Sequence, residues 1–181
     1  MDMTMDDIRQ SIEIQLQRLE DDTELTSAGD FSMAQRWAAT NTRLGLIIVV
    51  TTGIVAAISA AAALTDLQMY QRYFTLASTV LAAIATVIAS VLTFLKPSER
   101  GGQYREYGNK HEALRNRIRI YRSVLMKQDP SVERLSDQLV SFGQERDGLS
   151  SDNPPIPRSA FRSASRHMLE KRRRRIKLHG A

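Results

Sequence analysis

Two long uncharged segments constrain this chain more than any other feature. Residues 44–64 are 21 consecutive residues without a charged side chain, and residues 74–95 are 22 such residues. A helix of that length reaches about 31 Å, which is the thickness of the hydrocarbon part of a bilayer. A soluble protein would need a much larger shell than 181 residues provide to bury two such helices. The sequence therefore predicts two transmembrane helices.

The basic residues near these segments predict their orientation. The connection between the segments, residues 65–73, contains one basic residue, Arg72. The basic residues near the other ends of the segments are Arg36, Arg43, Lys96, Arg100, Arg105 and Lys110. Because Lys and Arg are enriched on the cytoplasmic side of membrane proteins, we expect the connection to face outward and both termini to be cytoplasmic. So short a connection makes the segments an antiparallel hairpin.

Small polar side chains recur on one side of the second segment. They are Thr75, Thr79, Thr86, Ser90 and Thr93. A comparable set in the first segment is Thr52, Ala56, Ser59 and Ala63. Small residues decide how helices approach each other in lipid. Either the two stripes pack against each other, or the stripe of the second segment lines a weakly polar pore in an oligomer. Neither segment contains an ionisable residue, which argues against a proton relay inside the bilayer.

Residues 1–43 form an acidic N-terminal region, with nine acidic and four basic side chains. Thr4 suits the N-cap of a helix, and Asp6 and Asp7 suit its first turn, where carboxylates interact favourably with the helix dipole. The apolar residues on one face of this helix are Ile8, Ile12, Leu16 and Leu19. The region is therefore expected to begin with an amphipathic helix.

The end of this N-terminal helix is expected near residues 21–23. A stretch rich in Ser, Gly and Asp follows over residues 26–30, a composition typical of a connection. Residues from Phe31 to Trp37 then form an amphipathic lead-in to the first transmembrane segment. Trp37 is expected near the inner headgroups or against the cytoplasmic helices.

A heptad pattern dominates residues 96–147. It follows Pro97 and an expected break at Gly101–Gly102. Its members are Tyr104, Tyr107, His111, Leu114, Ile118, Tyr121 and Leu125. This spacing predicts a helix of about 25 residues with one apolar seam. Asp129–Pro130 should end it, and a second helix is expected over residues 131–146. The two helices should fold back on each other in the cytoplasm, or the seam pairs with copies of itself in an oligomer.

The C-terminal part divides into a linker and a basic tail. Residues 148–158 contain three prolines, which prevent a regular helix, so this stretch is predicted to be a linker. Residues 159–181 are strongly basic, and the densest patch is Arg166, Lys171, Arg172, Arg173, Arg174, Arg175 and Lys177. Below a membrane, such a patch most simply binds anionic lipid. A solvated disordered tail and a nucleic-acid contact are the alternatives, although no aromatic residues are interleaved with the charges for base stacking.

The sequence offers no constellation for catalysis or metal binding. There is no cysteine, and the three histidines, His111, His167 and His179, lack the spacing of metal ligands. We therefore predict no catalytic, cofactor-binding or metal-binding residues, and no enzymatic activity. His111 lies on the heptad seam, which favours a histidine packed in a core or an interface.

The order of these features resembles a known family. The features are the Phe31…Trp37 lead-in, the short-looped hairpin over 44–95, the helix with Tyr104…Lys110-His111…Leu114-Arg115…Ile118, and its helical continuation. Over roughly residues 30–145 they resemble the SLATT domain, the SMODS and SLOG-associating two-transmembrane effector domain of bacterial nucleotide-signalling systems. The resemblance adds to the fold class expected from the residues: an all-α membrane protein with a transmembrane hairpin, an N-terminal helix, a long heptad helix and a fold-back helix.

The resemblance also implies a function. It implies an effector in the bacterial inner membrane that oligomerises, with a pore as one form of assembly, and perturbs or permeabilises the membrane in an antiviral defence or conflict system. Because no nucleotide-sensing domain is fused here, a separate signal-sensing protein or a small ligand would supply the trigger. The alternative is a non-conducting membrane anchor or adaptor, whose cytoplasmic helices dock a soluble partner.

Overall fold

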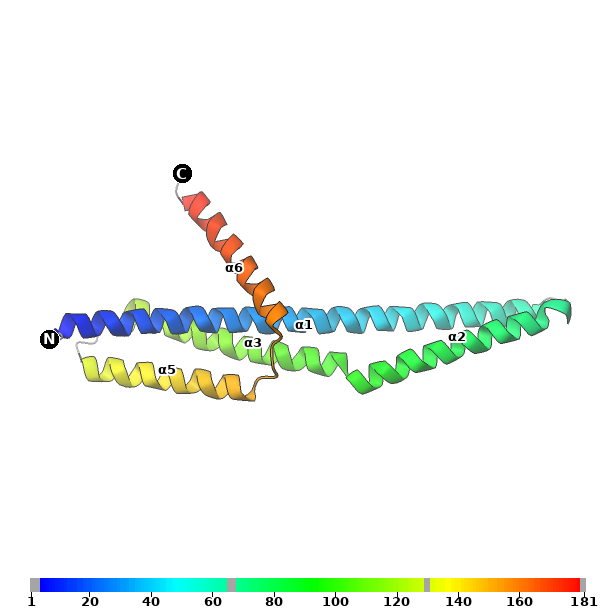
Figure 1. Ribbon diagram of the computed structural model, residues 1–181, viewed down its shortest axis with the longest axis horizontal. Helices are drawn as coiled ribbons and strands as arrows, with labels where there is room; N and C mark the ends of the chain where they lie inside the picture. The colour runs from blue at the N-terminus through cyan, green and yellow to red at the C-terminus, as the bar shows by residue number, and fades with distance from the viewer. Residues whose placement is uncertain (1–3, 65–67, 129–130, 180–181) are drawn as a thin grey trace. The chain divides into compact units, whose positions relative to one another are not determined.

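The computed structural model describes residues 4–64, 68–128 and 131–179, and these residues form helices joined by short connections, without a strand among them (Figure 1). The helices are α1 (Met5–Leu64), α2 (Gln68–Leu95), α3 (Pro97–Ile120), the π-helix η1 (Tyr121–Leu125), α4 (Met126–Gln128), α5 (Val132–Asp152) and α6 (Arg158–His179). The predicted all-α class is confirmed. The predicted break at Asp129–Pro130 and the first residues of the predicted outer connection, 65–67, lie outside the described residues.

The chain divides into two compact units. The first unit comprises Met1–Ala34 and Gly102–Ala181, and the second comprises Gln35–Gly101. The second unit therefore contains the predicted transmembrane segments, and the first contains the predicted N-terminal and heptad helices together with the basic tail.

The helix α1 begins at the cap that the sequence predicts. The N–H and the hydroxyl of Thr4 both donate to Asp7 Oδ2, at 3.0 Å and 2.7 Å, and the Asp7 N–H donates back to Thr4 Oγ1 at 3.3 Å. This reciprocal arrangement is a capping box, which satisfies backbone groups that a helix end otherwise leaves unpaired. The hydrogen bonds from the Thr4 hydroxyl and from the Thr4 N–H lower the pKa of the Asp7 carboxyl.

The predicted end of this helix at residues 21–23, and the predicted connection over 26–30, are wrong, since α1 is one helix from Met5 to Leu64. Hydroxyl groups in this stretch donate to backbone oxygens of the preceding turn. Thr23 donates to Leu19 O at 2.7 Å, and Ser27 donates to Glu24 O at 2.9 Å. Thr23, Ser27 and Asp30 are buried. Tertiary packing therefore outweighs the turn preference of these residue types.

The core of the first unit lies between α1, α3 and α5. Its fully packed members are Ile12, Leu16, Leu114, Ile118, Leu135 and Phe142. The predicted apolar face of the N-terminal helix is confirmed, because Ile12 and Leu16 are buried and Ile8 and Leu19 pack against them. Likewise, Leu114 and Ile118 of the heptad seam pack within one chain against residues of α5.

The π-helix η1 changes the register of the seam near its end. A π turn adds one residue to a helix, so every inward position after it moves along by one. Tyr121 packs against the core and its ring lies edge-on to Phe142, with centroids 5.6 Å apart. After η1, however, Met126 packs against the core, whereas Leu125 is 48% exposed. The inward position predicted for Leu125 is therefore wrong by one residue.

The break before α3 lies at Lys96 and not at Gly101–Gly102. Lys96 has a φ of 45°, which is unusual for a residue with a side chain, and Pro97 begins α3. The helix then continues through both glycines to Ile120. Lys96 Nζ also forms an ion pair with Glu99 Oε2 at 3.1 Å.

The helix α5 is longer than the predicted 131–146. Ser131 caps its start, accepting a hydrogen bond from the Arg134 N–H, and the helix continues to Asp152. The residues outside regular helix are consequently 153–157, which we call the Pro strap, instead of the predicted linker 148–158. Three prolines in five residues exclude a helix there.

Gly108 of α3 marks a close approach to α1. A Cβ placed on Gly108 would lie 3.0 Å from Cε1 of Phe31. We expect Gly108→Leu to destabilise the first unit by about 1–3 kcal/mol, because overpacking forces side chains and backbone to shift. The measurement is the change in unfolding free energy of the full chain in detergent micelles, followed by circular dichroism.

The matched control for this prediction is Gly143→Ala in α5. Apart from the adjoining residues and the backbone of α5 itself, nothing lies within 4 Å of a Cβ placed on Gly143, so alanine there should stabilise the helix by up to about 1 kcal/mol. If Phe31 causes the strain, the loss from Gly108→Leu should shrink in a Phe31→Ala background. An equal loss in both backgrounds would contradict the proposed contact.

Candidate functional site

The second unit contains two helices that are long and apolar enough to cross a membrane. The half-buried positions of the apolar part of α1 include Leu44, Ile48, Thr51, Val55, Ile58 and Ala62. Those of α2 include Phe74, Ser78, Leu81, Ala85, Ile88, Leu92 and Leu95. Both series alternate in steps of three and four, which is typical of two helices packed along one narrow seam. The remaining faces of both helices are exposed.

The Thr/Ser stripe of α2 lies off this seam. Its members, Thr75, Thr79, Thr86, Ser90 and Thr93, are all exposed. In the first segment, Thr52, Ala56 and Ser59 are exposed as well. Packing of the two small stripes against each other is therefore not what the structure shows. A single chain leaves the Thr/Ser stripe uncovered.

The hydroxyl groups of this stripe are directed to the backbone of their own helix. Thr86 donates to Ala82 O at 2.8 Å, Ser90 to Thr86 O at 2.8 Å and Thr93 to Ala89 O at 2.9 Å. Thr79 donates to Thr75 O at 2.7 Å in the same way. Each hydroxyl oxygen keeps acceptor capacity that a neighbouring helix or a water molecule can use. The stripe is thus weakly polar, and no donor is stranded in the apolar environment.

A buried polar cluster joins three parts of the first unit. His111 of α3 and Asp30 of α1 are both completely buried, and His111 Nδ1 lies 3.0 Å from Asp30 Oδ2 and 3.0 Å from Tyr107 O. Asn153, at the start of the Pro strap, donates through Nδ2 to Asp30 Oδ1 at 2.9 Å. Because both neighbours of Nδ1 are acceptors, that nitrogen carries the proton. The cluster contains no hydroxyl or thiol nucleophile, so it is suited to holding segments together.

Sequence reasoning placed His111 in a core or interface, and its burial confirms this. It missed Asp30 and Asn153, because Asp30 was assigned to a connection and Asn153 to a linker. One signal in the sequence could have found Asp30. This carboxylate lies at helical spacing from apolar residues that come before and after it. Among the residues that the structure describes, no group of three or more His, Asp or Glu side chains could hold a metal ion.

Three acidic residues of α1 are paired with arginines within the chain. Glu24 pairs with Arg115 at 3.3 Å, and Glu20 pairs with Arg122 at 3.1 Å. Asp22 Oδ2 lies 3.9 Å from Arg146 of α5, a long contact on the surface. Part of the acidic charge of α1 is thus paired with basic residues of α3, η1 and α5.

The Pro strap and the start of α6 are packed onto α1 and α3. The Tyr104 hydroxyl donates to Pro155 O at 3.0 Å. Ile156 and Phe161 lie 3.5 Å and 3.6 Å from a Cβ placed on Gly29, so a larger residue there would meet both. Ala160 and Ala164 of α6 are buried.

The basic patch predicted for the tail falls within α6. Arg166 is exposed. The backbone of α6 continues as a helix to His179, while the side chains of Lys171, Arg172, Arg173, Arg174, Arg175 and Lys177 lie outside the described part. Two exposed arginines earlier in α6, Arg158 and Arg162, were not included in the predicted patch.

Comparison with known proteins gives one match. A family model described as the SMODS and SLOG-associating 2TM effector domain, in its fungal form, matches residues 31–145. This range is more than half of the chain, and it contains the apolar part of α1, all of α2 and α3, and most of α5. No curated protein and no solved structure matches the chain.

Proposed function

The chain belongs to the SLATT family of two-transmembrane effector domains, and on this premise we propose that it oligomerises in a membrane and permeabilises it. The family and the two long apolar helices make it a membrane-associated effector. That the chain permeabilises the membrane goes beyond the family assignment and is the part that we propose. The proposal includes no catalytic activity and no cofactor.

The exposed Thr/Ser stripe of α2 is the observation that carries this proposal. A stripe of hydroxyl groups gains little from contact with lipid tails, whereas small polar residues let neighbouring helices approach closely and hydrogen-bond to one another. Copies that turn α2 toward a common axis would cover the stripe and give the axis a weakly polar wall. Closed rotational symmetry is the usual result of such repeated contacts.

The contacts between copies are placed on α2 in this proposal. The predicted assembly seam is mostly occupied within one chain, where Tyr104, His111, Leu114 and Ile118 are buried. Leu125, its last member, is exposed and remains free for a neighbour. The apolar helices would form an antiparallel transmembrane hairpin with both termini in the cytoplasm, as the distribution of Lys and Arg favours.

The proposal also includes a biological setting. We propose that the chain acts after a signal from a separate sensing protein, in antiviral defence or a related conflict, and its match to an effector domain associated with SMODS and SLOG domains supports this. The matching model is the fungal one, so the proposal concerns a cellular membrane in general. The bacterial inner membrane implied by the resemblance stays a prediction.

Replacement of two hydroxyl residues tests the pore wall. We expect Thr86→Leu/Ser90→Leu to reduce dye release from liposomes that contain the purified chain to the rate of protein-free liposomes, because an apolar constriction excludes water. The matched control is Val87→Leu/Val91→Leu, which adds the same side chain at two neighbouring exposed positions and removes no hydroxyl group. Unchanged release by a correctly assembled Thr86→Leu/Ser90→Leu protein would exclude this stripe as the pore wall.

A membrane adaptor is the second candidate function. Ile120, Val124 and Leu125 leave an apolar surface on α3 and η1, with exposed fractions of 54%, 47% and 48%. Such a surface suits the docking of a soluble partner. This function predicts intact liposomes and a partner whose binding is lost in Ile120→Ser/Val124→Ser. Dye release without such a partner would favour the effector instead.

A further inference from the structure

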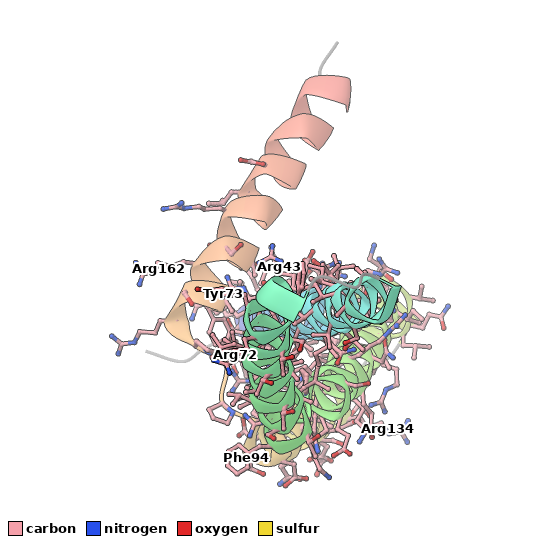
Figure 2. All side chains as sticks on the ribbon, turned by 90° about the vertical axis from the view of Figure 1, so that its right-hand side faces the viewer. Arg43, Arg72, Tyr73, Phe94, Arg134 and Arg162 are labelled. Atoms are coloured by element: carbon pink, nitrogen blue, oxygen red, sulfur yellow. The ribbon has the colours of Figure 1, made fainter. Side chains whose placement is uncertain are left out.

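We propose that Arg158, Arg162 and Arg166 of α6 form an arginine row that binds the phosphate-bearing headgroups of an anionic bilayer. The three residues are four positions apart, so they follow one side of the helix. All three are exposed, and Figure 2 shows Arg162 pointing outward from α6. The inference goes beyond permeabilisation and depends only on the membrane location of the chain.

The first turns of α6 are packed so that the arginine row stays exposed. Ala160 and Ala164 lie on another side of the helix, with exposed fractions of 0% and 5%. Phe161 is half-buried beside Gly29. Small residues at 160 and 164 let the backbone of α6 come close to its neighbours. The side of α6 that carries the row is consequently left for a partner.

The Pro strap fixes the position of this helix start. Asn153 is bonded to the buried Asp30, and Pro155 accepts from the Tyr104 hydroxyl. Ile156 lies over Gly29. Three prolines further restrict the backbone of the strap. A binding surface that is held in place before binding loses less conformational entropy when the ligand arrives.

The charge of the arginine row is not neutralised by the acidic region of α1. Glu20, Asp22 and Glu24 are paired with arginines of η1, α5 and α3, respectively. Within the described parts of the chain, none of the three arginines of the row is in an ion pair. The sequence of α6 contains one acidic residue, Glu170. The row therefore keeps a local positive charge of the kind that attracts phosphate groups.

Two observations favour a bilayer over nucleic acid as the anionic partner. The apolar helices tether α6 to a membrane, which makes binding to lipid headgroups an intramolecular event at high effective concentration. Single-stranded nucleic acid is usually held by aromatic side chains on which bases stack. Phe161, the aromatic residue of α6, is half-buried in its contact with α1 and not free for stacking.

The absence of cysteine from the sequence permits a direct test. A single fluorescent label at Ser163→Cys, an exposed position beside Arg162, reports on the full chain in lipid nanodiscs. With quencher-labelled headgroups, we expect quenching to increase with the phosphatidylserine fraction and to decrease with added salt. Arg158→Gln/Arg162→Gln/Arg166→Gln should lower the equilibrium constant for contact roughly a hundredfold, since each arginine contributes independently.

The matched control is Arg105→Gln/Arg119→Gln/Arg134→Gln. It removes the same charge from exposed arginines outside α6 and should keep the quenching. Tyr104→Phe, which removes the hydroxyl that donates to Pro155 O, should weaken quenching without changing charge. Equal losses in the two triple variants would overturn the proposal, because net charge alone would then explain binding.

Nucleic acid provides the second way to overturn the proposal. A label that responds to a single-stranded oligonucleotide in phosphatidylcholine nanodiscs, and not to phosphatidylserine, would assign the row to nucleic acid. The quenching is measured separately from dye release. Intact liposomes together with normal quenching would therefore reject permeabilisation and leave the arginine row supported.

Discussion

Replacement of His111 by leucine is expected to destabilise the first unit by about 3 kcal/mol, because the buried carboxyl group of Asp30 then loses a hydrogen-bond donor. His111 and Asp30 are both completely buried, and their facing atoms are 3.0 Å apart. Leucine fills the space of the ring but leaves the Asp30 carboxyl with a single donor, Asn153. The measurement is urea unfolding of the full chain in micelles, followed by circular dichroism.

A double variant separates the lost partner from the lost packing. In Asp30→Ala/His111→Leu no carboxyl group is left behind, so we expect much of the stability to return. Asn109→Leu, an exposed position of α3, serves as the surface control and should have little effect. The single variants Asp30→Ala and His111→Leu are measured in the same way. If the loss of unfolding free energy in the double variant equals the sum of the two single losses, Asp30 and His111 do not stabilise the fold as a pair.

Truncation of Leu114 is the second change with a large expected effect. Leu114 is completely buried between α1, α3 and α5, so Leu114→Ala removes packed methyl groups and leaves a cavity. Such truncations cost about 2–5 kcal/mol. The same urea experiment measures this loss, and the fit also shows whether the denaturant dependence changes, which would indicate a different folded state.

Leu125→Ala is the matched control for Leu114→Ala, because both residues occupy seam positions in the heptad pattern of the sequence. With η1 in place, Leu125 is exposed, and its truncation should change stability by less than about 0.5 kcal/mol. Met126→Ala should cost more than Leu125→Ala, since Met126 packs against the core. The opposite order would show that the seam continues without the extra residue of the π turn.

The candidate site was predictable from the sequence only in part. The Thr/Ser stripe of α2 could be read from residue types and spacing, but its exposure could not, because exposure depends on which face of α2 meets its neighbour. The sequence predicts His111 as a packed histidine, but its partner Asp30 is 81 positions away, and Asn153, which donates to Asp30, is 123 positions from that carboxylate. No local pattern identifies a hydrogen bond over such a separation.

The sequence by itself determined the features that depend on local properties. The two apolar helices follow from uncharged length, the cap at Thr4 follows from residue type, and the core faces around Leu16 and Ile118 follow from periodicity. Each of these depends on residues within a few turns of one another, so each can be read without knowing the fold.

Only the tertiary structure decided how these helices continue and what covers them. Residues 26–30 stay helical because buried contacts outweigh the turn preference of Ser, Gly and Asp, and η1 moves the inward position from Leu125 to Met126. Arg158 and Arg162 are exposed, whereas Glu24 and Glu20 of α1 are paired with Arg115 of α3 and Arg122 of η1. The physical reason is common to all of them: burial and charge pairing are set by residues distant in the sequence, and these contacts outweigh local preferences wherever the two disagree.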